Sequence, residues 1–273
     1  MKSGVLATII LVGACGPGDR TDNGQPDARD GTGDSQSLPT SRVYAHSGST
    51  LYQVDTQTLA PVTVGAMGGL GTQSLTDLAI DKNDHMVGIT LDKLYTVDAT
   101  TGTVTLISAL STGGFTSLSF VPSDLNNPSS TDILVSANDQ GDVYSIDATN
   151  GSATKIGSYG SVAAGKVISS GDLIGVRGFG IYATVDVGTA TQDYLARIDP
   201  ATWKATPLGT GTGFDNIFGL AFWDGTIYGF VSTGTDAGKI ITIDPNTGAG
   251  HEVLGGSVRW YGAGVATNAP ILQ

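Results

Sequence analysis

A short unit recurs five times along the chain, and it constrains the fold more than any other feature. The unit is a five-residue strand that ends in aspartate and is followed by a polar turn. Its clearest copies are LYQVD, LYTVD and VYSID, and its weaker copies are LARID and IITID, so the five aspartates are Asp55, Asp98, Asp147, Asp199 and Asp244. Successive aspartates lie 43, 49, 52 and 45 residues apart. Such a period, with β-type strands, is typical of the blades of a propeller.

Each unit contains further strands, and the two chain ends complement each other. Runs such as LTDLAI (75–80) and MVGI (86–89) precede the repeated strand, which gives four strands per blade. The first unit lacks the innermost of these strands, and residues 260–266 supply one at the end of the chain. We therefore predict an all-β, five-bladed β-propeller of four-stranded blades over residues 41–273, closed by the C-terminal strand. Six irregular blades are the alternative, because residues 165–193 carry two inserts.

Composition agrees with strands and tight turns. The chain has 24 Asp but a single Glu, Glu252, and 40 of its 273 residues are Gly. Asp and Gly favour turns, whereas Glu favours helices. The net charge of −12 argues against a nucleic-acid partner, which would require a basic face.

The N-terminus resembles the export signal of a bacterial lipoprotein. A basic start and a short apolar stretch lead to Val-Gly-Ala-Cys, which is similar to a lipobox ending at Cys15, the only cysteine. We expect a signal peptide over 1–14, a lipidated Cys15, and a disordered tether to residue 40, because residues 16–40 are polar and rich in Gly and Pro. The resemblance implies anchoring in the cell envelope, and Gly16 after the cysteine implies the outer membrane, on its periplasmic or surface side.

The repeated sequence pattern of the rest of the chain is similar to that of a broad family. The Leu-Tyr-x-Ile-Asp-x-x-Thr-Gly pattern resembles the NHL/YVTN-like and quinoprotein-like propeller repeats of bacterial surface and secreted proteins. The resemblance covers residues 41–273 and implies the fold. It leaves the activity open, because propellers host many unrelated functions.

The sequence offers no catalytic or metal-binding constellation. The five repeated aspartates precede turns, where such side chains cap backbone N–H groups. The glutamate of lactonase-type propellers is missing, since Glu252 falls in an outer strand beside His251. His46, His85 and His251 fall in different blades and are not expected to converge. We predict no cofactor; calcium at the turns 81–84 or 138–142 is an alternative.

The loops at one end of the propeller are the predicted binding face. Connectors between blades are rich in Gly and carry polar groups at their ends, and in propellers they surround the mouth of the axial channel. The candidate residues there are Asp77, Lys166, Asp215, Asn216, Arg259 and Trp260. The alternative is that these residues only pack and cap the ring. Trp203 and Trp223, in turns of the opposite face, form a second candidate surface.

These observations favour a binding or scaffold module over an enzyme. We expect a monomeric, lipid-anchored propeller that recognises a protein or glycan partner. The alternatives are a hydrolase or lyase acting on envelope carbohydrate or a lactone, and a purely structural envelope subunit.

Overall fold

The structure is a computed structural model, and it describes residues 41–234, 236–256 and 258–271. All of these residues belong to one compact unit, Ser37–Gln273. The predicted signal peptide (1–14), the lipidation site Cys15 and the tether to residue 40 lie outside the described residues.

Within the described residues, twenty-one strands form five antiparallel sheets, which are the five predicted blades. Blade 1 contains β21 (Gly262–Val265), β1 (Val43–His46), β2 (Thr50–Val54) and β3 (Pro61–Ala66). Blade 2 contains β4 (Asp77–Ile80), β5 (Met86–Ile89), β6 (Lys93–Val97) and β7 (Val104–Ala109). Blade 3 contains β8 (Ser119–Pro122), β9 (Asp132–Ala137), β10 (Asp142–Ile146) and β11 (Ala153–Ser158).

Blade 4 is the irregular one, and it contains five strands where four were predicted. These are β12 (Ser161–Val162), β13 (Gly165–Val176), β14 (Gly180–Val187), β15 (Tyr194–Ile198) and β16 (Ala205–Pro207). The extra residues of 165–193 lie in the long strands β13 and β14, and the short β12 precedes them, so this part of the chain enlarges one blade. The alternative of six irregular blades is therefore wrong. Blade 5 contains β17 (Ile217–Trp223), β18 (Thr226–Thr233), β19 (Asp236–Ile243) and β20 (Gly250–Gly255).

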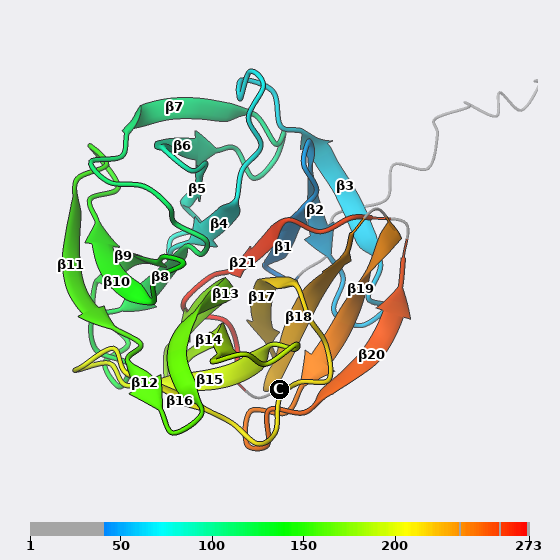
Figure 1. The fold of residues 1–273 in the computed structure, drawn as a ribbon. Coiled ribbons are helices and arrows are strands. Elements are labelled where there is room, and N and C mark those ends of the chain that lie inside the picture. The colour runs from blue at the N-terminus through cyan, green and yellow to red at the C-terminus, as the bar shows by residue number, and fades with distance from the viewer. Residues whose placement is uncertain (1–40, 235, 257, 272–273) are drawn as a thin grey trace, which may run out of the picture. The chain divides into compact units, whose positions relative to one another are not determined.

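The ring closes as predicted, with the last strand completing the first blade. In Figure 1, the red β21 lies beside the blue β1, and the two strands pair from Val43–Val265 to His46–Gly262. The innermost strands β21, β4, β8, β13 and β17 contact one another in this order around the centre. Every residue of β4, β8 and β21 is buried, because each inner strand is covered by neighbouring blades on both faces.

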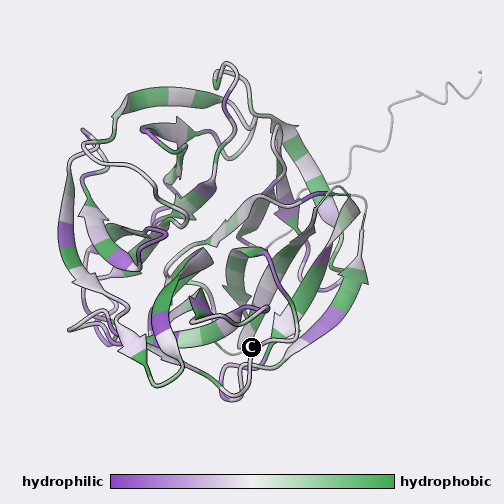
Figure 2. Ribbon diagram, in the orientation of Figure 1, coloured by the Kyte–Doolittle hydropathy of each residue, from purple (hydrophilic) through white to green (hydrophobic). Residues whose placement is uncertain are grey.

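The outer strands are only half buried, and most carry the same irregularity. Figure 2 shows mixed hydropathy along β7, β11 and β20, in keeping with one face toward a neighbouring blade and one toward water. A β-bulge interrupts the pairing of the outermost strand in blades 1, 2, 3 and 5. Such bulges twist an exposed edge and discourage it from pairing with other chains.

The repeated aspartates act as turn caps. In each turn, the aspartate Oδ1 accepts a hydrogen bond from the backbone N–H two residues later, as Asp98 does from Thr100 at 2.8 Å. The pKa of each of the five carboxyl groups is lowered, for Asp98 and Asp147 chiefly by the hydroxyl of the threonine two residues later and for the other three chiefly by backbone N–H groups of the turn. The five aspartates thus define the turns between the third and fourth strands, as predicted.

The far end of the ring is crossed by the segment that follows β21. Ala266 pairs with Ile80 of blade 2, and the carbonyl of Thr267 accepts the N–H of Arg177 in blade 4. The Thr267 hydroxyl donates to Asp132 of blade 3 at 2.8 Å, and Asp132 is also ion-paired with Arg177. Both side chains of this ion pair are less than a tenth exposed, at 4% and 8%. The pair joins two blades and the C-terminal segment in a buried setting.

Removing one partner of this buried pair should destabilise the ring strongly. Replacing Arg177 with Met leaves the Asp132 carboxylate buried without its cation, which typically costs about 3–5 kcal/mol. Denaturant unfolding of R177M should show a loss in that range. Lys155→Met, which breaks the exposed Lys155–Asp142 pair, is the control and should cost less than about 1 kcal/mol. Equal losses in the two variants would contradict the structural role of the Arg177 pair.

Candidate functional site

The centre of the ring is built from one repeated position on the inner strands. Aligning the five blades places Asp77, Ser117, Asp172, Gly219 and Gly262 at this position, which we call the axial position. A Cβ on Gly219 would lie 2.6 Å from the backbone nitrogen of Ala263, and one on Gly262 would lie 2.6 Å from Asp77 Oδ1. Blades 5 and 1 therefore require glycine here, because the neighbouring inner strand already occupies the space.

Two aspartates at the axial position bind the inner strands to one another. Asp77 Oδ1 accepts the N–H of Leu78 at 2.9 Å, and its Oδ2 accepts the N–H of Leu118 in the next blade at 2.7 Å. Asp172 repeats the arrangement with Leu173 and with Leu220 of its next blade, both at 2.6 Å. A bulge in β13 leaves Asp172 outside the strand ladder, where its carboxyl group is available for these contacts.

The two carboxyl groups also meet each other across the centre of the ring. Both are fully buried, and this loss of hydration raises the pKa of Asp77 well above its usual value. The negative charge of Asp172 and a hydrogen bond between the two carboxyl groups raise it further. Burial likewise raises the pKa of Asp172 to about 8. The pair therefore holds a proton at neutral pH, since two adjacent charges without water are costly.

His46 and Tyr159 complete this buried polar group. A Cβ on Gly262 would meet His46 Nε2 at 2.6 Å, the same distance as Asp77 Oδ1, so the imidazole lies beside the carboxyl pair. Burial lowers the pKa of His46 to about 4, which keeps the ring neutral. His46 Nε2 and the Tyr159 hydroxyl are both buried without a hydrogen-bond partner among the described residues. Burial and the nearby Asp172 raise the pKa of Tyr159.

A pocket of about 210 Å³ opens at the axis on the face of the blade connectors. We call it the axial pocket. Four of its lining residues, from four different blades, directly precede the axial position: Thr76, Thr116, Phe218 and Tyr261. The rest of the lining consists of Leu91, Phe115 and Ser170. Leu91 is 59% exposed at the rim. The pocket thus offers aromatic and aliphatic surface with a few hydroxyl groups.

The residues predicted for the mouth occupy different places. Asp77 is buried at the axial position next to the pocket, whereas Lys166 is exposed in the β12–β13 hairpin and donates to Gln140 at 3.2 Å. Asp215 and Asn216 are exposed in the connector before β17. None of these four residues lines the axial pocket.

The side chains of Arg259 and Trp260, which precede β21, lie in different environments. The Arg259 guanidinium lies over the ring of Tyr261, 5.4 Å from its centroid, and so stands near the pocket. Trp260 is only 2% exposed and packs edge-on against Tyr52 and Phe230.

The tryptophans of the other face also differ in exposure. Trp203 is 6% exposed and packs against Gly157 of the preceding blade. Trp223, at the end of β17, is partly buried against the core. Little of the Trp203 surface is therefore free to touch a partner.

The axial pocket was not predicted from the sequence, although a signal for it exists. Its lining residues directly precede the axial position in the aligned repeats, so an alignment by register would have placed Phe218 and Tyr261 together. The contribution of Leu91, from the loop between β5 and β6, has no such signal. His46 and Asp77 meet at the axis although they are distant in sequence and belong to different blades.

Neither a metal centre nor a membrane-spanning helix is found among the described residues. No three of their His, Cys, Asp or Glu side chains gather in a way that could hold a metal ion. The carboxyl of Asp81 and the amide of Asn138, in the turns considered for calcium, accept backbone N–H groups of their own turns. Within the same residues, no helix has the length and apolar character needed to cross a membrane.

No family model and no curated protein matches the chain. Among solved structures, a protein of unknown function from Bacteroides thetaiotaomicron is 14% identical with a TM-score of 0.49, over 69% of this chain and 53% of that one. A TolB-like protein from Agrobacterium tumefaciens is 15% identical with a TM-score of 0.46, over 80% and 79% of the two chains. BamB from Moraxella catarrhalis is 13% identical with a TM-score of 0.37, over 81% and 72%. These neighbours are β-propeller proteins.

The buried carboxyl pair should make stability fall as the pH rises from 7 to 8.5. The folded chain holds the proton of Asp172 more tightly than the unfolded chain, so this contribution is present at low pH and is lost as the pH rises through about 8. Burial also raises the pKa of Asp193, to about 7, so most of its contribution is already lost where this window begins. The turn aspartates titrate below the window, and His46, with a pKa of about 4 when folded and about 6.5 when unfolded, adds only a small opposite slope near pH 7. The free energy of unfolding at several pH values measures the slope.

Asp172→Asn should flatten this slope, by at most about 1.4 kcal/mol per pH unit. The comparison of slopes holds even if the variant is less stable at every pH. Asp139→Asn, at an exposed turn position, is the control and should keep the original slope. An unchanged slope in Asp172→Asn would show that the pair does not hold the proton.

Proposed function

We propose that this chain is a binding module of the bacterial cell envelope, and that the axial pocket receives an apolar side chain of a protein partner. The observation that carries the proposal is the pocket itself, at the centre of the connector face and lined by the rings of Phe115, Phe218 and Tyr261. The exposed Leu91 at its rim extends the apolar surface outward. Apolar pockets with a few polar groups are the usual binding sites of proteins.

The composition of the lining favours a protein over a glycan. The Thr76, Thr116 and Ser170 hydroxyls are the only side-chain polar groups, apart from the Tyr261 phenol, that line the pocket within the described residues. A glycan presents many hydroxyl groups that would lose water here without enough partners, which is costly. An aromatic or aliphatic side chain loses nothing comparable, and burying it is favourable. Arg259 beside Tyr261 adds a positive charge for an acidic neighbour on the same partner.

An enzyme acting on a carbohydrate or a lactone is less well supported. The paired carboxyl groups of Asp77 and Asp172 would be the natural acid and base, since their pKa values are raised. Both are fully buried, however, and neither lines the axial pocket. All four carboxyl oxygens already accept backbone N–H groups. They support the inner strands in a way that leaves little capacity for reacting with a substrate.

The anchor is a separate part of the proposal. The lipobox-like sequence ending at Cys15 supports attachment to the membrane by a lipid, and the polar residues 16–40 support a tether between the anchor and the propeller. A partner in the envelope would then meet a propeller held near the membrane.

Changing the rim of the axial pocket should weaken partner binding. We expect peptides selected from a random displayed library to share an aromatic or aliphatic anchor residue. Leu91→Asp places a charge at the rim and should weaken these peptides at least 10-fold, which corresponds to about 1.4 kcal/mol. Leu106→Asp is the matched control, because Leu106 is similarly exposed (54%) but lies on the outer strand β7. Calorimetric titration measures both affinities.

Two results would count against this site. Selected peptides that bind both variants equally would place the binding surface elsewhere. A glycan array that gives ligands sensitive to Leu91→Asp, with no peptide selected, would replace the protein partner by a carbohydrate.

Substituting the predicted lipidation site should release the protein from the membrane. Cys15→Ser removes the thiol to which the lipid would be attached, so the protein should move from the detergent phase to the aqueous phase on Triton X-114 partition. Ser3→Ala, in the same segment, is the control and should stay with the detergent. Detergent-phase partition of Cys15→Ser that matches the unaltered chain would rule out lipid attachment at this residue.

A further inference from the structure

The contacts between neighbouring blades, which we call seams, follow one rule in four of the five cases. In blades 2 to 5, the residue six positions beyond the repeated aspartate donates its backbone N–H to the connector that follows the preceding blade. The four bonds are Val104 to Gly68 O (3.2 Å), Ala153 to Ser111 Oγ (2.8 Å), Ala205 to Tyr159 O (3.1 Å) and Gly250 to Thr212 O (2.9 Å). Each seam is thereby closed by a main-chain donor.

The fifth seam, between blades 5 and 1, cannot be closed in this way. The equivalent residue in blade 1 is Pro61, and proline has no backbone N–H to donate. Two residues earlier, Leu59 adopts a left-handed φ of 59°, at a place where blades 2, 3 and 5 have glycine. The sequence of this one turn therefore departs from the repeat at both positions that shape the seam.

The facing strand differs at the position that meets this turn. In the closed seam between blades 1 and 2, that position is Gly65, which pairs with Leu51, and a Cβ on it would lie 1.9 Å from the carbonyl oxygen of Thr101. In blade 5 the same register position is Leu254, which pairs with Ile240, and it lines the space between blades 5 and 1. A side chain at this position therefore prevents the turn of blade 1 from approaching as closely as the turn of blade 2 does.

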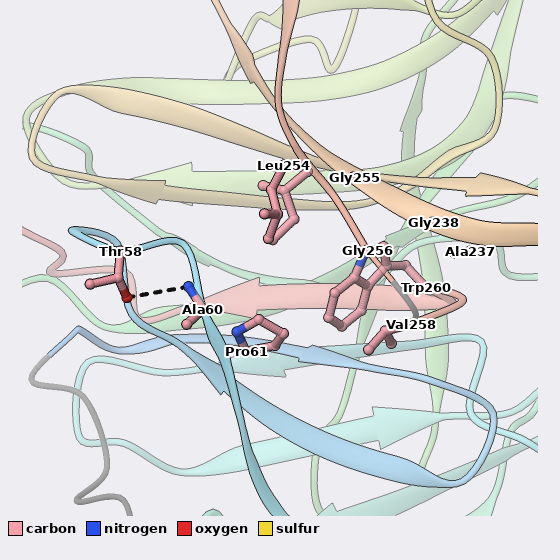
Figure 3. A pocket seen from close by; sticks show the side chains of 11 residues that line it. Thr58, Ala60, Pro61, Ala237, Gly238, Leu254, Gly255, Gly256, Val258 and Trp260 are labelled. Atoms are coloured by element: carbon pink, nitrogen blue, oxygen red, sulfur yellow. Dashed lines mark hydrogen bonds between the residues drawn. The ribbon is translucent and has the colours of Figure 1, made fainter.

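A groove of about 630 Å³ occupies this open seam, and we call it the seam groove. Figure 3 shows Leu254 of blade 5 on one side, Pro61 of blade 1 on the other, and Trp260 beside them. Ala60, Ile240 and Val258 add apolar surface. The volume lies in the range of sites for small molecules, about 300–1,000 Å³.

The charges around the groove select for a neutral ligand. None of the described residues that line it is charged. Near it, Lys239 and Glu252 pair with each other, Nζ to Oε2, at 2.6 Å, so neither offers an unpaired charge to a ligand. A charged molecule would lose its hydration in the groove without a counter-charge, whereas a neutral apolar molecule would gain from burial.

We propose that the seam groove is a second binding site, which takes a neutral, apolar small molecule between Leu254 and Pro61. The site is distinct from the axial pocket, with which it shares no lining residue. It exists because one turn of the repeat has lost the N–H that closes the other seams.

The test uses the neutral dye Nile red as the probe and fluorescence titration of the full chain as the readout. The unaltered protein should bind the dye saturably. Ala60→Phe fills the groove from an exposed wall position and should weaken binding at least 10-fold. Thr103→Phe is the matched control: it is the equivalent exposed residue in blade 2, where the seam is closed, and it should leave binding unchanged.

A second variant and a cross-check make the result decisive. Leu254→Asp places a charge on the blade 5 side of the groove and should also weaken binding. Thermal melting verifies that each variant is folded. Saturable binding that survives both groove variants, or its absence from the unaltered chain, would overturn the proposal. Binding that is lost in Leu91→Asp but kept in Ala60→Phe would assign the dye to the axial pocket and also overturn it.

Discussion

The close approach of the five inner strands is the constraint on which the rest of the structure depends. Two carboxyl groups, those of Asp77 and Asp172, accept N–H groups from their own blade and from the next. The glycines at positions 219 and 262 let the remaining strands approach without a Cβ in the way. Because a buried carboxyl group is tolerated only when its oxygens are satisfied, the aspartates fix the relative positions of the strands they join.

This arrangement also limits the axial pocket on the side away from the connector face. The carboxyl pair and His46 fill the middle of the ring, and residues 266–270 cross its far end. What remains open is the space above the axial position, lined by the residues that precede it. In this register the hydroxyls of Thr76 and Thr116 donate to the backbone of the second strand of their blades, whereas Phe218 and Tyr261 contribute aromatic rings to the lining.

The fold could be predicted from the sequence because the repeat is local. Each aspartate and its turn lie within a few residues of each other, and the orphan strands at 42–45 and 260–266 show how the ring closes. The axial pocket could not be predicted in the same way, since its lining comes from five blades and depends on register at the axis. Blade 4 illustrates the limit, because a bulge rather than a motif brings Asp172 to the centre.

The seam groove could be predicted only in part. The sequence shows that Pro61 interrupts the repeat, but its effect on the contact between blades is seen only when the five seams are compared in the structure. The closing segment connects both cavities: Trp260 lines the groove, and Tyr261, the next residue, lines the axial pocket. A change at Trp260 would also remove its contacts with Tyr52 and Phe230 and disturb the start of β21. Its effect on binding could not be assigned to one cavity. Substitutions at Ala60 and Leu91 distinguish binding in the two cavities, because each of these residues lines only one of them.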